Sequence, residues 1–214
     1  GYLGESRYGL RNLVSRSAGA GETSMRDHYA ARAEPPGTAP RLPLPEPRLR
    51  FAAHQVKATQ ERFGVAGPYA VFCPGAEYGP AKRWPYFAEL ASRMSIEKVL
   101  LGSGNDAEAA RGVRGTNLVG RTSLDEAIDL IAGAQYVVSN DSGLMHVAAA
   151  LGRPQVALFG SSSPLHTPPL SSAARVLWLK VECSPCFQRE CPLGHFRCMR
   201  EMTVDKVAAE IENL

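Results

Sequence analysis

From residue 68 to the C-terminus, short apolar runs alternate with segments whose apolar residues recur every three or four positions. The runs predict strands and the amphipathic segments predict helices, because side chains alternate faces along a strand and share a face at helical spacing. The predicted strands are Tyr69–Cys73, Lys98–Gly102, Thr116–Val119, Gln135–Ser139, Gln155–Phe159 and Arg175–Lys180. The predicted helices are Pro85–Ser95, Asp106–Val113, Leu124–Ala132, Gly143–Leu151 and Val204–Glu212.

Regular alternation of strands and helices predicts the α/β class, with a Rossmann-like, doubly wound parallel sheet. Two boundary signals support the helices: Ser123 and Glu126 fit a capping box, and Gly152 fits the position after a helix end. Ligands of such sheets bind at the carboxyl ends of the strands. The loops after Cys73, Gly102, Ser139 and Phe159 are therefore expected to carry the chemistry.

The first 66 residues have a weaker pattern, with a proline-rich stretch over residues 35–47 that no regular element can contain. Short helices are predicted at Met25–Ala33 and Ala52–Phe63. Because the sequence begins at Gly1 in what reads as the middle of a domain, we expect residues 1–66 to be the remnant of an N-terminal domain plus a linker. Residues 67–214 then form a second domain.

Composition narrows the function classes. The net charge is +3 with basic residues dispersed along the chain, which gives little support to nucleic-acid binding. No stretch of about 18 apolar residues predicts a membrane-spanning helix, and no secretory signal is evident at the start. We therefore expect a cytoplasmic protein with 44% hydrophobic residues available for its core.

The loop over residues 74–85 joins a predicted strand to a predicted helix. It contains two glycines for close backbone approach, and Lys82 and Arg83 directly precede the helix. Exposed helix amides, the helix dipole and two cations favour a diphosphate. The alternative is a surface turn with a solvated basic pair.

The loop at residues 139–146 has a similar design. Asp141 or Ser142 can cap the following helix, Gly143 permits close approach, and His146 lies in the first turn, where a ring N–H can reach the same anion. An ordinary helix cap and a structural histidine are the alternatives. These alternatives are less favoured because two helix starts suited to an anion share one edge of the sheet.

The loop after Gly102 resembles a dinucleotide fingerprint but lacks its third glycine, because position 107 is alanine. A Rossmann oxidoreductase is therefore disfavoured, and no P-loop supports phosphoryl transfer. Asp106 or Glu108 could accept hydrogen bonds from a ribose. Capping of a helix by Asn105 or Asp106 is the alternative.

A cysteine-rich segment lies near the C-terminus, with Cys183, Cys186, Cys191 and Cys198 within 16 residues. In a reducing compartment, clustered cysteines suggest a metal before a disulfide, so a structural zinc ion is one hypothesis. The spacing is not that of a zinc ribbon, and Pro185 and Pro192 stiffen the segment. Reduced packing thiols or disulfides remain alternatives.

Three runs in the sequence resemble glycosyltransferase family 9, the heptosyltransferases: residues 72–85, residues 139–152 and residues 183–195. The resemblance is strong over residues 68–214 and extends to the opening residues 1–9. It implies a GT-B fold, in which two Rossmann-like domains face a cleft and the C-terminal domain binds the donor. The sequence would then lack the first part of the N-terminal domain.

The resemblance also implies site residues. Lys82 and the turn Asp141-Ser142-Gly143, with His146, would hold the ADP diphosphate, and Ala76 and Glu77 would lie against the donor phosphate or sugar. Asp106 or Glu108 would contact the adenosine ribose. The general base would belong to the absent part of the N-terminal domain, so no catalytic base is assigned in this chain.

The implied reaction is inverting transfer of heptose from ADP-L-glycero-D-manno-heptose to the lipopolysaccharide inner core, as its second heptose. The acceptor would be lipid A carrying Kdo and one heptose, reached at the inner membrane surface by a cytoplasmic, peripheral enzyme. Lys82, Arg83 and His146 would stabilise the departing ADP, so no cofactor is required. We expect this chain alone to bind ADP weakly and to turn over nothing. The alternatives are a GT-B enzyme for another nucleotide sugar and a non-catalytic, zinc-stabilised interaction module.

Overall fold

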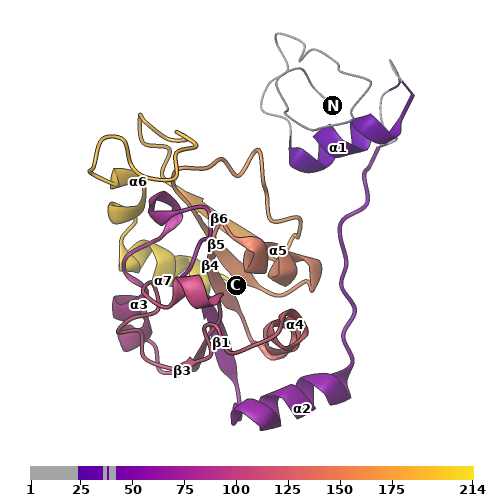
Figure 1. Ribbon diagram of the computed structural model, residues 1–214, viewed down its shortest axis with the longest axis vertical. Coiled ribbons are helices and arrows are strands. Elements are labelled where there is room, and N and C mark those ends of the chain that lie inside the picture. Colours follow the sequence, from indigo (N-terminus) through magenta and orange to yellow (C-terminus); the bar gives the residue numbers. More distant parts are fainter. Residues whose placement is uncertain (1–23, 36–37, 39–41) are drawn as a thin grey trace. The chain divides into compact units, whose positions relative to one another are not determined.

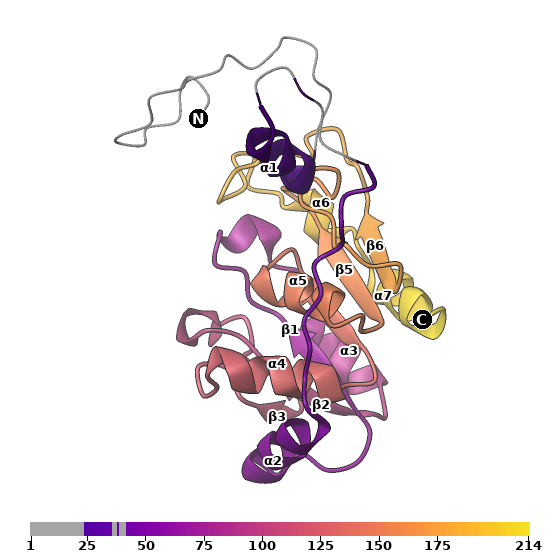
Figure 2. The ribbon, with the colours of Figure 1, turned by 90° about the vertical axis from the view of Figure 1, so that its right-hand side faces the viewer.

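The computed structural model describes residues 24–35, 38 and 42–214 (Figures 1 and 2). Contacts divide the chain into two compact units, one of residues 1–44 with 165–167 and one of residues 45–164 with 168–214. In the first unit the structure describes helix α1 (Met25–Ala33), at its predicted bounds. Ser24 caps α1 by accepting a hydrogen bond of 3.1 Å from the Asp27 amide.

The second unit is built on a six-stranded, wholly parallel sheet with the strand order β3-β2-β1-β4-β5-β6. This order runs outward from β1 in both directions, so the predicted doubly wound sheet is confirmed, and its switch point lies between β1 and β4. The strands are β1 (Tyr69–Cys73), β2 (Glu97–Leu100), β3 (Thr116–Asn117), β4 (Val137–Asn140), β5 (Gln155–Phe159) and β6 (Ala174–Trp178).

Helices cover both faces of the sheet (Figure 2). Along β1, Ala70 and Phe72 belong to one buried cluster, whereas Tyr69, Val71 and Cys73 belong to another. This alternation follows from the pleat of a strand, and burial on both sides explains why β1 is apolar throughout. The first cluster packs α3 (Phe87–Arg93) and α7 (Val204–Glu212), and the second packs α2 (Ala53–Phe63), α4 (Leu124–Gly133) and α5 (Gly143–Ala150).

The helices differ from the predicted set at two places. No helix forms over Asp106–Val113, where a 3-10 turn at Gly104–Asp106 leads into further turns. Gly112 has φ +74° within that segment, a left-handed conformation that interrupts a right-handed helix. One short helix was not predicted, α6 (Arg197–Arg200), because a single turn carries no helical periodicity.

Helix α2 belongs with the sheet. Thr59 donates a 2.8 Å hydrogen bond to Asp129 on α4, and Arg62 forms an ion pair with Glu126. The second unit therefore begins before the predicted boundary at residue 67, and the assignment of residues 1–66 to a former N-terminal domain stays a prediction. Among the helices of the described residues, none has both the length and the apolarity needed to cross a membrane.

Candidate functional site

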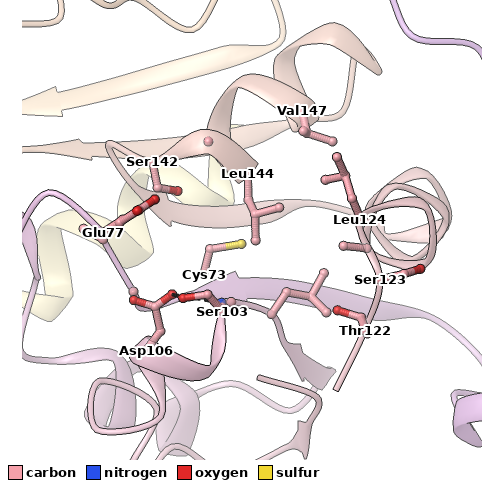
Figure 3. Close-up of a pocket in the computed structure, with 16 residues that line it drawn as sticks. Cys73, Glu77, Ser103, Asp106, Thr122, Ser123, Leu124, Ser142, Leu144 and Val147 are labelled. Carbon is pink, nitrogen blue, oxygen red and sulfur yellow. Dashed lines mark hydrogen bonds between the residues drawn. The ribbon is translucent and has the colours of Figure 1, made fainter. Parts of the chain in front are cut away.

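A cavity of about 410 Å³ lies at the carboxyl ends of β1 and β2, between the N-terminal ends of α4 and α5 (Figure 3). This volume and position are typical of small-ligand sites in doubly wound sheets. The lining residues come from four loops and two helix starts. They are Cys73, Gly75, Ala76, Glu77, Leu101, Gly102, Ser103, Asp106, Thr122, Ser123, Leu124, Ala127, Ser142, Gly143, Leu144 and Val147.

The two ends of the cavity differ in chemistry. In Figure 3, Leu124 and Val147 approach each other at one end, whereas Glu77 and Ser142 lie at the other, and the Cys73 sulfur projects between them. The apolar end suits the flat faces of a nucleobase, and the polar end suits charged groups.

The polar end contains an uncapped helix start. Ser142 occupies the N-cap of α5 but makes no side-chain hydrogen bond to the helix; its Oγ lies 3.2 Å from Ser139 Oγ instead. The expectation that Asp141 or Ser142 caps this helix is therefore wrong. At α4, by contrast, the Ser123 and Glu126 side chains form the predicted reciprocal capping box. The first amides of α5 are consequently available to an anion in the cavity.

Asn140, a fully buried residue at the end of β4, ties down the loop at residues 74–85. Its Nδ2 donates to the Pro74 carbonyl at 2.7 Å and to the Gly75 carbonyl at 3.3 Å. Its Oδ1 accepts from the Trp84 amide at 3.1 Å. This role was not predictable from the sequence, because it depends on a partner 56 residues away.

Lys82 projects from this loop and pairs with Asp141. Lys82 Nζ lies 2.5 Å from Asp141 Oδ2, and Ser162 Oγ donates to the same oxygen at 2.6 Å. Both side chains of the ion pair are largely buried, at 15% and 5% exposure. Asp141 thus orients the Lys82 ammonium and offsets its charge.

His146 lies on the first turn of α5, near this pair. Loss of hydration lowers the pKa of His146 below its ordinary value; the positive charge of Lys82 adds to this, while Asp141 opposes it. Its imidazole is therefore mainly neutral at pH 7 in the ligand-free chain. A bound anion would favour the protonated form.

Comparison with known proteins identifies the family of this chain. The profile of glycosyltransferase family 9 (heptosyltransferase) matches residues 1–197. The chain is 40% identical to lipopolysaccharide heptosyltransferase 2 of Escherichia coli K12, over 100% of this chain and 68% of that protein. It is 36% identical to lipooligosaccharide heptosyltransferase 2 of Haemophilus ducreyi, over 100% of this chain and 69% of that protein. The chain belongs to glycosyltransferase family 9.

The solved structure of E. coli ADP-heptose LPS heptosyltransferase II superposes with a TM-score of 0.75 at 38% identity, covering 89% of this chain. The superposition covers 61% of that chain, so the family 9 chain described here spans less than two thirds of its solved relative. A family 9 glycosyl transferase from Veillonella parvula shares the fold, with a TM-score of 0.63 at 22% identity. The predicted family and α/β fold are confirmed.

Of the two acidic candidates for the ribose in this family 9 chain, one reaches the cavity. Asp106 is buried at its wall, where its Oδ2 accepts hydrogen bonds from Ser103 N at 2.9 Å and Ser103 Oγ at 2.8 Å. Glu108 is exposed, lies outside this cavity and pairs with Arg111. Of the two, Asp106 therefore borders the cavity, and its contact with a ribose stays a prediction.

Arg83 does not line the cavity either. Its Nη2 donates to the Ala76 carbonyl at 3.3 Å and lies 3.6 Å from Asp106 Oδ1. Arg83 therefore connects the loop after β1 to the loop after β2.

The zinc site suggested for the cysteine-rich segment stays a prediction. Within the part of the chain that the structure describes, no three His, Cys, Asp or Glu side chains are arranged to hold a metal ion, and all five cysteines are free thiols. Cys183, Cys186, Cys191 and Cys198 do border one small hollow. Cys198 lies on α6 and packs into a core cluster, whereas the other three lie on the preceding loop.

The thiols are expected to differ in reactivity. Burial raises the pKa of Cys73 to about 12. Burial also opposes ionisation of Cys191, but backbone N–H groups of Phe196, Leu193, His195 and Gly194 outweigh it and lower the pKa of that thiol. Because thiolates are the nucleophiles, iodoacetamide should modify Cys191 first, at a pH below that needed for ordinary cysteine, and Cys73 last. Peptide mass spectrometry across pH 6–9 measures both; equal rates would contradict the prediction.

Proposed function

We propose that this chain binds ADP-L-glycero-D-manno-heptose and serves the inverting transfer of its heptose to the lipopolysaccharide inner core, as the second heptose. The relatives named heptosyltransferase 2 support the reaction, and the name of the E. coli structure supports the donor. The observation that carries the proposal is the convergence of the uncapped start of α5 with Lys82 beside the sheet switch point.

In this proposal the adenine lies at the apolar end of the cavity, between Leu124 and Val147, with the ribose near Asp106. The diphosphate then reaches the α5 amides at Ser142 and Gly143, and Ala76 and Glu77 border the phosphate and sugar. Lys82, paired with Asp141 next to this helix start, and His146 on the first turn of α5 lie outside the lining of the cavity. This order of contacts matches the apolar-to-polar gradient of the cavity.

The proposed catalysis depends on where negative charge develops during the reaction. As the bond between the heptose anomeric carbon and the ADP oxygen breaks, negative charge grows on the departing diphosphate. The Lys82 ammonium, the α5 amides and the His146 ring would stabilise that charge. Inversion also needs a general base on the opposite face of the sugar, and the family resemblance assigns that carboxylate to an N-terminal domain.

The proposed acceptor is lipid A bearing Kdo and one heptose. Such an acceptor lies at the inner membrane surface, so we propose a cytoplasmic enzyme that meets the membrane peripherally. Detergent-solubilised acceptor and ADP-heptose, incubated with the full-length enzyme, would test this assignment by the mass of the product.

Calorimetric titration tests donor recognition directly. We expect ADP to bind with a stoichiometry of one per chain and more tightly than UDP or GDP. Tighter binding of UDP or GDP would indicate a different nucleotide sugar. Zinc found at one per chain, together with unchanged ADP binding in Lys82→Ala, would favour the non-catalytic interaction module instead.

A further inference from the structure

The cysteine-rich segment contacts the loop at residues 74–85, which we call the donor loop. The Ala81 amide donates to the Arg189 carbonyl at 3.0 Å, and the Tyr78 hydroxyl donates to the Phe187 carbonyl at 2.6 Å. Arg189 Nη2 in turn donates to the Glu77 carbonyl at 3.3 Å. Two segments more than 100 residues apart in the sequence are therefore joined beside the polar end of the cavity.

The approach of the two backbones is close enough to require glycine. Gly79 has φ +145°, and a Cβ at this position would lie 2.4 Å from the Arg189 carbonyl oxygen. Glycine avoids this clash and adopts the conformation without strain. Gly79, the residue after Tyr78, therefore allows the backbones of the donor loop and the cysteine-rich segment to lie this close together.

The Tyr78 ring connects two cations. Lys82 Nζ lies 4.8 Å from the ring centroid, and the Arg189 guanidinium carbon lies 5.3 Å from it. Both distances are within the range of cation–π attraction. The Lys82 ammonium is therefore held from two directions, by Asp141 and by the Tyr78 ring.

Packing alone does not account for this arrangement. Tyr78 is 38% exposed and Arg189 is exposed, so neither side chain fills the core. Their contacts instead converge on the stretch of donor loop that runs from Glu77, which lines the cavity, to Lys82, which lies outside its lining. Because these two exposed side chains contact the donor loop and not the core, their contacts fix the position of the loop.

We propose that Tyr78 and Arg189 are positioning residues for Lys82, which they hold toward the diphosphate of the donor. Arg189 fixes the Glu77 carbonyl and so the path of the chain into Tyr78, and the Tyr78 ring then limits where the Lys82 ammonium can lie. The inference rests on the proposed function, since it assumes that Lys82 meets a diphosphate. It gives the cysteine-rich segment a role in donor binding that needs no metal.

The test compares Arg189→Met with Arg197→Met, a matched control on the same segment. Arg197 pairs with Glu201 and has no hydrogen bond or ion pair to the donor loop among the described contacts. By ligand-observed NMR titration, Arg189→Met should bind ADP about five- to tenfold more weakly than the parent, the summed effect of one hydrogen bond and one cation–π contact. Arg197→Met should match the parent, and adenosine, which lacks phosphate, should bind parent and Arg189→Met equally.

Tyrosine variants and a double variant separate positioning from other roles. Tyr78→Phe retains the ring and should recover most of the affinity lost in Tyr78→Leu. In a Lys82→Met background, Arg189→Met should cause no further loss. An additional loss there would mean that Arg189 meets the ligand itself, and parental ADP affinity in Arg189→Met would also overturn the inference. Failure of the parent to bind ADP would instead reject the proposed function.

Discussion

Replacing Lys82 with methionine should weaken ADP binding about 100-fold, the largest loss that we expect from any single change at this site. Two effects combine. The variant removes a cation within reach of the proposed diphosphate, and it leaves the Asp141 carboxylate, 5% exposed, with Ser162 as its remaining hydrogen-bond donor. An uncompensated buried anion beside a bound phosphate repels it, and together these effects amount to about 3 kcal/mol.

The effect of the unpaired Asp141 charge can be separated from the loss of the Lys82 cation. Adding Asp141→Asn to Lys82→Met removes the unpaired charge, so the double variant should bind ADP about fivefold to tenfold more tightly than Lys82→Met alone. Asp141→Asn by itself should weaken binding, because Lys82 loses its orienting partner. Lys206→Met, on the exposed face of α7, controls for a general loss of positive charge. Calorimetry that shows additive losses from the two changes would reject the ion-pair account.

The fold was predictable from local pattern because burial on both faces makes central strands such as β1 and β5 largely apolar. Tyr69–Cys73 and Gln155–Phe159 are strands at their predicted bounds. Val204–Glu212 is a helix at its predicted bounds as well, since its apolar residues repeat at helical spacing. The helix prediction for Asp106–Val113 was wrong because the Asp106 carboxylate caps a tight turn and Gly112 adopts a left-handed conformation. Both effects override a weak helical pattern.

The location of the site was predictable from the sequence, but the role of each side chain was less so. Strand ends that are followed by glycine, lysine and Asp-Ser-Gly identified the correct edge of the sheet, since parallel strands bring their carboxyl ends together. The partners of each side chain were not visible. Asp141 could be read as a helix cap and instead pairs with Lys82, and Arg83 could be read as a phosphate ligand and instead connects Ala76 with Asp106.

Contacts between distant segments were beyond sequence reasoning altogether. No periodicity or spacing links Tyr78 to Arg189, and nothing local in the sequence shows that Asn140 holds both ends of the donor loop. The cysteine spacing suggested a zinc ion because four thiols are close in sequence. The placement of Cys198 on a separate helix is a property of the tertiary fold.

Two glycines in the cavity wall should respond to alanine in opposite ways. A Cβ on Gly75 would lie 2.1 Å from Asp106 Cγ and 2.5 Å from Asp106 Cβ, so that Asp106 would have to leave its hydrogen bonds to Ser103. Gly75→Ala should therefore lower the free energy of unfolding by about 3 kcal/mol, from overpacking and a lost cap. For a chain of this size, the melting temperature should fall by about 6–12 °C.

Gly143→Ala should leave the fold intact and reduce binding. A Cβ on Gly143 would meet nothing within 4 Å, and alanine is a better helix former than glycine, so the melting temperature should stay level or rise. The added methyl group would occupy space at the start of α5 that the proposed diphosphate needs, and ADP affinity should fall about tenfold or more. Calorimetric scans and ADP titrations of both variants separate stability from binding. Parental ADP affinity in Gly143→Ala would contradict the close approach of the diphosphate to this helix start.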